Sequence, residues 1–262
     1  MHCAGSQAKT HFDPLFPEAS TVDLKEVSLV DPDQHWYYQS KLSVLRRALR
    51  RWPVSHLRLV DVGAGSGFLA RGLARPGADE YVVCVDPNYS EDSRIEDNGR
   101  WRYVRSADPE SVRNATVLLF IDVLEHVPDD TDLLAGYVSQ AAPGTLVLIT
   151  VPAFMSLWSS HDVFLEHYRR YRLPELKLVA ERSGLTVLHQ KYLFATIFPA
   201  VWVIRRLRRS RVAASDLDSI PRPINFALKV LLGLEHRLPW NRLFGVSAFL
   251  VARVPDQVAP TR

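Results

Sequence analysis

The sequence contains little cysteine and no long apolar run. Its 262 residues include only two cysteines, Cys3 and Cys84, which excludes a disulfide framework and a four-cysteine zinc site. No apolar run reaches the ~18–20 residues that a membrane-spanning helix needs. The first residues also lack the basic start and apolar core of a secretory signal. We therefore expect a cytoplasmic protein without disulfides.

A strong excess of one charge is missing as well. Lysine and arginine number 32 against 29 for aspartate and glutamate, so the formal net charge is +3. That excess is too small for the basic surface typical of nucleic-acid-binding proteins. The hydrophobic share of 47% is too high for an intrinsically disordered chain. These values indicate a globular protein with no nucleic-acid partner.

Short apolar runs alternate with amphipathic stretches from residue 57 onward. The runs of strand length cover 57–62, 81–85, 101–104, 117–121, 145–151, 185–194 and 246–253. Stretches with helical spacing cover 68–75, 131–141 and 174–183. This alternation predicts an α/β fold, namely a Rossmann-like, doubly wound, mostly parallel seven-stranded sheet with helices on both faces.

An N-terminal helical arm and a helical insertion before the last strand complete this organisation. Asp31 is the expected N-cap of a helix that ends before Pro53. We expect a single domain over 1–262, with the arm and its helix at 1–53, the cofactor-binding core at 57–194, the insertion at 195–245 and the last strand at 246–254.

The insertion contains an apolar stretch, 197–204, that is followed by five arginines between 205 and 211. A second amphipathic helix is expected at 224–238. An apolar helix bordered by arginines can lie on an anionic membrane surface. It can equally cover the core as a lid or form a homodimer face. A peripheral membrane or homodimer contact through 197–211 therefore stays open.

A glycine turn follows the first apolar run directly. Gly63, Gly65 and Gly67 alternate with other residues before a helix, and Asp86 follows the next apolar run, 19 residues beyond Gly67. Glycines here let the backbone turn tightly and let a ligand approach it. In doubly wound sheets an acidic residue at the position of Asp86 accepts hydrogen bonds from a nucleoside ribose.

The spacing of this turn differs from that of a dinucleotide site. In G-x-G-x-x-G the third glycine would stand where this chain has Phe68. Asp61, two residues before the first glycine, would repel a pyrophosphate but suits a ligand with an ammonium group. Asp61 can alternatively be a buried carboxylate that is bound to backbone amides near the turn.

With these features the chain resembles the class I S-adenosylmethionine-dependent methyltransferases. The matching motifs are VDVGAGSG (60–67), VCVDP (83–87), FIDVLEHVPDD (120–130) and APGTLVLITVP (142–152). The segment LWSSHDVFLEHYRRY (157–171) is similar to the one after the fifth strand in a bacterial type 11/12-like subfamily of mostly unassigned substrate. The resemblance implies S-adenosylmethionine as cofactor and methyl transfer to a small-molecule acceptor.

The same resemblance implies where the cofactor lies. Asp86 would take the ribose hydroxyls, Asp108 the adenine amino group, and Asp122 would face the sulfonium. Around 108 the chain departs by one residue from the usual Gly-Asp-Ala pattern, and Asp108-Pro109 can instead be an ordinary turn or helix start. The full set implied for the cofactor is Asp61, Gly63, Ala64, Gly65, Asp86, Pro87, Asp108, Asp122 and Val123.

Two regions hold candidates for catalysis and for the acceptor. A histidine after the fifth strand is suited to take a proton from the nucleophile, and an aromatic face suits a sulfonium cation. The catalytic candidates are His161, His167, Tyr37, Tyr38 and Asp162, and the acceptor-binding candidates are Trp158, Arg169, Arg170 and Tyr171. Alternatively, His161, Asp162 and Arg169 form a hydrogen-bonded brace with Tyr171 in the core. His126 is either a base or a loop brace.

We expect no metal site, because His161, Asp162 and His167 have no helical i, i+4 pairing and no cysteine lies near them. Two other functions share the same binding residues. One is attack on another sulfonium carbon, by intramolecular cyclisation or aminopropyl transfer, with release of methylthioadenosine. The other is a non-catalytic cofactor-binding or scaffolding protein, against which the intact Asp61, glycines and Asp86 argue.

Overall fold

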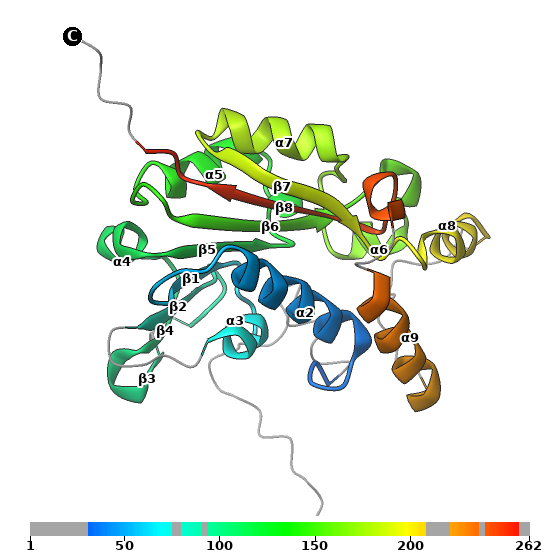
Figure 1. Cartoon of the computed structure of the whole chain (residues 1–262), viewed down its shortest axis with the longest axis horizontal. Helices are drawn as coiled ribbons and strands as arrows, with labels where there is room; N and C mark the ends of the chain where they lie inside the picture. The colour runs from blue at the N-terminus through cyan, green and yellow to red at the C-terminus, as the bar shows by residue number, and fades with distance from the viewer. Residues whose placement is uncertain (1–30, 75–79, 91–93, 208–220, 236–238, 257–262) are drawn as a thin grey trace, which may run out of the picture.

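One mixed sheet organises the part of the chain that the computed structural model describes, residues 31–74, 80–90, 94–207, 221–235 and 239–256 (Figure 1). It has eight strands. In spatial order they are β3 (Arg94–Glu96), β4 (Trp101–Val104), β2 (Tyr81–Val85), β1 (Arg58–Val62), β5 (Val117–Ile121), β6 (Leu146–Pro152), β8 (Ser247–Arg253) and β7 (Thr186–Leu193).

The sheet is mostly parallel, and the expected Rossmann-like fold class is confirmed. β8 is antiparallel to both of its neighbours, β6 and β7. The expected number of seven strands is wrong by one. The additional strand, β3, pairs antiparallel with β4 at the sheet edge. It has only three residues, too few to establish an alternation of apolar and polar side chains. Only its backbone pairing with β4 identifies it as a strand.

Helices cover both faces of the sheet (Figure 1). Because successive side chains of a strand point to opposite faces, Val60 of β1 packs in one apolar core and Leu59 in the other. The first core includes residues of α4 (Pro109–Asn114), α5 (Asp130–Val138) and α7 (Leu173–Arg182). The second includes residues of α2 (Trp36–Arg51), α3 (Phe68–Leu73) and α9 (Arg222–Glu235). In sheets of this kind a ligand binds at the carboxyl ends of the parallel strands.

The start of α2 differs from the expectation. Asp31 does not cap this helix: its carbonyl accepts hydrogen bonds from the amides of Gln34 and His35 at 3.1 and 2.9 Å, and its side chain accepts one from Asp33 at 3.0 Å. Asp31 therefore closes a separate turn, and its acceptors are used there. The N-cap is His35, which accepts from the amide of Tyr37.

The expected insertion contains α8 (Phe198–Leu207) and α9. α9 packs against α2, whereas α8 has no buried residue and exposes Trp202, Val203 and Ile204. A contact through 197–211 stays a prediction, and 208–211 lie outside the described residues. The boundaries of arm, core and insertion stay predictions too. Among the helices of the described residues, none is both long and apolar enough to cross a membrane.

Candidate active site

The glycine turn lies between β1 and α3, at the carboxyl end of the sheet. Gly63, Gly65 and Gly67 have φ angles of 69°, 51° and 70°, a left-handed backbone that glycine adopts without strain. A Cβ at Gly63 would lie 2.5 Å from Cγ2 of Val123, which follows β5. The backbone of the turn therefore approaches the neighbouring strand end at a distance that only glycine permits.

Asp86 connects the glycine turn to the end of β2. It is 6% exposed, and its Oδ2 accepts a hydrogen bond from the Gly65 amide at 3.1 Å. Its Oδ1 accepts from the backbone and side-chain nitrogens of Asn88 at 3.0 and 3.1 Å. The hydroxyl of Tyr89 donates to the Gly65 carbonyl at 2.6 Å. Asp86 thus holds the turn in place and presents a carboxylate where a ribose is expected.

A buried lysine holds Asp122 at the end of β5. Lys41 of α2 is 2% exposed and forms an ion pair with Asp122 Oδ2. The hydroxyl of Tyr37 donates to the same oxygen at 3.1 Å, and the hydroxyl of Thr150 donates to Oδ1 at 3.0 Å. Asp122 has a φ of 55°, which strains a non-glycine residue. These contacts fix a strained, partly exposed carboxylate at the sheet edge.

Lys41 was not among the expected site residues. One signal was present, since Lys41 stands at the helical spacing of the apolar positions Tyr37 and Leu45. A lysine in a buried stripe needs a charged partner, because an unpaired buried ammonium is costly. The partner, Asp122, lies 81 residues away, so the helix pattern alone does not identify it.

Aromatic rings surround Tyr37. Its ring centroid lies 5.7 Å from that of Trp36 and 5.6 Å from those of Tyr38 and Phe194. Tyr38 is 4% exposed and packs edge-on against Phe68. Of the two expected tyrosines, Tyr37 reaches the sheet edge through its bond to Asp122. Tyr38 contributes packing.

Asp162 organises the segment after β6. It lies in α6 (Ser160–Phe164), with its side chain fully buried, and its Oδ1 lies 3.0 Å from His167 Nδ1 and 2.6 Å from Arg170 Nε. The Ser159 amide donates to Oδ2 at 2.8 Å. Burial by itself would raise the pKa of Asp162, but the hydrogen bond from His167 and the charge of Arg170 hold that pKa well below its usual range. Asp162 therefore stays ionised at neutral pH.

The expected acceptor residues make their polar contacts within the protein. Arg170 is 5% exposed and, besides Asp162, donates to the Ala153 carbonyl at 3.1 Å. Arg169 donates to Asp130 at 3.0 Å. Tyr171, 3% exposed, donates to the same Asp130 at 2.6 Å. These are the contacts of a brace, and acceptor binding by the three residues stays a prediction.

The structure also places the other expected residues. Asp108 caps α4, accepting from the Ser111 amide at 2.8 Å, and pairs with Arg102 at 3.1 Å. Asp61 is 3% exposed within β1. The remaining placements are a buried Ala64 in the glycine turn, an exposed Pro87 after β2, and partly exposed Trp158 and His161 before and in α6. Their roles stay predictions.

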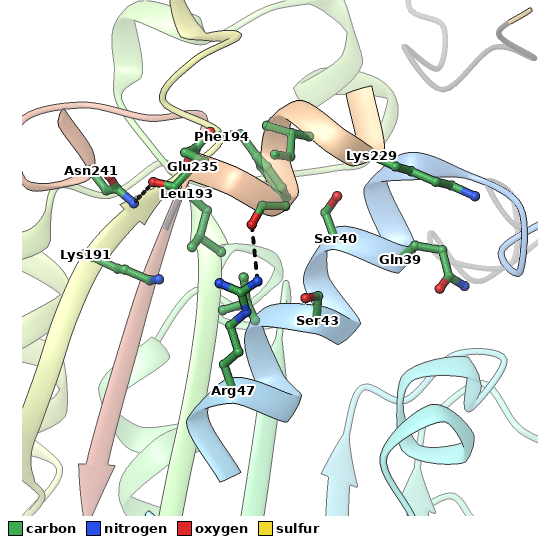
Figure 2. A pocket seen from close by; sticks show the side chains of 13 residues that line it. Gln39, Ser40, Ser43, Arg47, Lys191, Leu193, Phe194, Lys229, Glu235 and Asn241 are labelled. Carbon is green, nitrogen blue, oxygen red and sulfur yellow. Dashed lines mark hydrogen bonds between the residues drawn. The ribbon is translucent and has the colours of Figure 1, made fainter. Parts of the chain in front are cut away.

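A cavity of about 160 Å³ lies between α2, β7 and α9 (Figure 2). Arg47, Lys191 and Glu235 are among the charged residues that line it. Burial and the charge of Arg47 lower the pKa of Lys191. Phe194 lines the cavity and also contacts the ring of Tyr37, so this cavity adjoins the aromatic residues beside Asp122.

Residues 34–190 match a family model described as a methyltransferase domain. This match covers more than half of the chain. The chain belongs to the methyltransferase family. The recognition expected from the sequence is thereby confirmed, and the cofactor of the class is S-adenosylmethionine.

Curated relatives align with part of the chain. An uncharacterized methyltransferase of Mycobacterium sp. (strain JLS) is 32% identical over 113 residues, which are 42% of this chain and 44% of the relative. A ubiquinone biosynthesis O-methyltransferase of Methylococcus capsulatus is 26% identical over 153 residues, 56% of this chain and 58% of the relative. The chain spans about half the length of the curated relatives it matches.

Solved structures share the fold. The S-adenosylmethionine-dependent methyltransferase of Mesorhizobium loti superposes with a TM-score of 0.50 at 15% identity, covering 85% of this chain and 99% of that one. A chain in the complex of the Haloferax volcanii Trm112 methyltransferase activator with a methyltransferase gives a TM-score of 0.53 at 16% identity, covering 91% and 95%. At these identities the likeness shows the fold alone.

The residues at the sheet edge fit the chemistry of S-adenosylmethionine. Asp86 would offer carboxylate oxygens to the two ribose hydroxyls, and Gly63 leaves no side chain over the turn. Asp122 would offer a carboxylate to a positive sulfur. Because the Lys41 ammonium lies 4.3 Å from the centroid of the Tyr37 ring, the opposite face of that ring would offer π density to the sulfur. Both carboxylates are acceptors, and the hydroxyl, ammonium and sulfonium groups of the cofactor are donors or cations.

Proposed function

We propose that this chain transfers the sulfonium methyl group of S-adenosylmethionine to a small-molecule acceptor by in-line displacement. One observation carries the proposal: Asp86 and Asp122 follow the two strands that flank β1, with the glycine turn between them. In the proposal Asp86 binds the ribose, the turn accommodates the methionine part, and Asp122 lies beside the sulfonium.

Methyl transfer needs geometry more than acid–base chemistry. The cofactor supplies an electrophilic methyl group on positive sulfur. The acceptor atom must lie about 3–3.5 Å from that carbon and in line with the sulfur, in a site that excludes water. Tyr37 and Lys41 position Asp122, and the surrounding rings keep water out. For a nucleophile that starts protonated, we propose His161 as the base, because Asp162 already engages His167 Nδ1.

The direct test is the identity of the nucleoside product. The protein is incubated with S-adenosylmethionine alone and then with aqueous and lipid fractions of a cell extract, followed by mass spectrometry. S-adenosylhomocysteine that forms only with extract supports methyl transfer. Methylthioadenosine without extract would contradict it and indicate cyclisation. No product with any fraction, despite cofactor binding, would favour a non-catalytic protein. Because one relative is named for O-methylation, we propose hydroxyl-bearing compounds as the first acceptors to test.

Tyr37→Phe is expected to lower turnover about 10-fold while cofactor affinity stays within about 2-fold. The substitution removes one hydrogen bond to a charged carboxylate, about 1.5 kcal/mol, and leaves the ring in place. Turnover is followed by S-adenosylhomocysteine formation and affinity by calorimetry. The matched control is Tyr137→Phe, which removes a hydroxyl from α5 and should change neither quantity. Equal losses of turnover and affinity in Tyr37→Phe would indicate a bracing role only.

A further inference from the structure

Three potential metal ligands meet beside the expected cofactor site. One ligand atom each of Glu125, His126 and His167 lies within 4.8 Å of the others. Glu125 and His126 belong to a short 3-10 turn, η2 (Leu124–His126), directly after β5 and Asp122. His167 comes from the segment that follows α6. The fold thus joins a glutamate and two histidines that methyl transfer, as proposed above, does not use.

The Glu125 carboxylate lacks a hydrogen-bonding partner. Its side chain is fully buried, and neither oxygen accepts a hydrogen bond from another described residue. The nearby cations, Lys41 and Arg170, are paired with Asp122 and Asp162. Because buried carboxylates are costly without a counter-charge, this one points to a cation that the protein itself does not supply.

Both histidines are already oriented by hydrogen bonds from outside the cluster. His167 Nδ1 lies 3.0 Å from Asp162 Oδ1, the arrangement in which an outer carboxylate orients a metal-binding imidazole and leaves Nε2 as the ligand. His126 is hydrogen-bonded to the backbone of Leu165, and its ring centroid lies 4.6 Å from that of His167.

We propose that Glu125, His126 and His167 bind a divalent transition-metal ion, with zinc as the ion of highest affinity among those tested below. Two imidazoles and one carboxylate form a donor set that prefers zinc to magnesium or calcium. Three protein ligands leave a coordination position for water or for an oxygen atom of a small molecule. From the sequence we expected no metal site. That expectation considered His161, Asp162 and His167 as ligands, and it did not consider Glu125 and His126.

The charges around the cluster are compatible with a dication. Arg170 and Arg205 both pair with Asp162, the partner of His167, at 2.6 and 3.7 Å. Lys41 faces Asp122. Metal binding is independent of methyl transfer, so either proposal can fail without the other.

The test is a titration of the full chain after treatment with a chelator. Calorimetry with zinc chloride should show one site per chain, and magnesium chloride should bind at least about 100-fold more weakly. Glu125→Gln and His167→Gln should each weaken zinc binding about 100-fold. His56→Gln, which removes an exposed imidazole far from the cluster, should leave zinc binding unchanged. Circular dichroism establishes that each variant is folded, and His126→Gln replaces any variant that is not.

Cobalt(II) gives a second readout that does not depend on activity. Bound by two histidines and a carboxylate, it should show visible absorption bands that Glu125→Gln abolishes and His56→Gln retains. The proposal is overturned if the chelator-treated protein binds no zinc, or if the cluster variants bind zinc as tightly as the unaltered chain. In either case the three residues form only a polar cluster without a metal ion.

Discussion

Asp86→Ala is expected to weaken the binding of S-adenosylmethionine about 100-fold or more. In the proposed site the carboxylate accepts two hydrogen bonds from the ribose hydroxyls, and bonds to a charged group contribute about 1.5–3 kcal/mol each. A loss of about 3 kcal/mol corresponds to about 100-fold in affinity. The substitution also removes the hydrogen bond that the Gly65 amide donates to Asp86 at 3.1 Å, which adds to the loss by loosening the glycine turn.

Calorimetry with S-adenosylmethionine measures this change, and a melting curve shows whether the variant is folded. Asp86→Asn keeps the shape of the side chain without its charge, so we expect an intermediate loss. Glu181→Ala is the control, because it removes an exposed carboxylate of α7 that forms an ion pair with Lys177 on the same helix. Unchanged cofactor affinity in a folded Asp86→Ala protein would show that the ribose is bound elsewhere.

Asp162→Asn is expected to lower the free energy of unfolding by about 3–5 kcal/mol. Removing one partner of a buried ion pair leaves the other charge uncompensated. Here the uncompensated charge is Arg170, whose side chain is 2% exposed. The Ser159 amide and His167 lose a charged acceptor in addition. Urea unfolding measures the difference, and Asp132→Asn on the exposed face of α5 is the control. A change below about 1 kcal/mol would contradict this account of the segment.

The effect of Asp162→Asn on the free energy of unfolding is also expected to depend on pH. In the folded state, burial by itself would raise the pKa of Asp162. The hydrogen bond from His167 and the charges of Arg170 and Arg205 outweigh burial and lower this pKa. The unfolded state therefore takes up its proton first, near pH 4. The contribution of Asp162 is complete above about pH 4 and is lost as the pH falls below that value. The difference in unfolding free energy between the two proteins should be constant near neutrality and should decrease in acid. A constant difference down to pH 2 would show that another group dominates.

The sequence by itself determined the fold class and the family, and it predicted the position of the cofactor edge. These follow from contiguous patterns, since a strand, a glycine turn and a helix are neighbours along the chain, and Asp86 follows the next strand. Asp122 was predicted as a site residue for the same reason, because it ends an apolar run. In each case the strand order of a parallel sheet brings the strand ends to one edge, so local patterns suffice.

Only the tertiary structure decided which side chains meet. Lys41 was visible as a polar residue at a core position of a helix, but its partner Asp122 is set by the packing of α2 on the sheet edge. His167 reaches Glu125 and His126 because the segment after α6 folds back over η2. β3 exists through pairing with β4. These contacts join residues that are distant in sequence, and their free energy depends on burial and charge pairing that arise when the chain packs. These contacts therefore cannot be read from the pattern of residues along the chain.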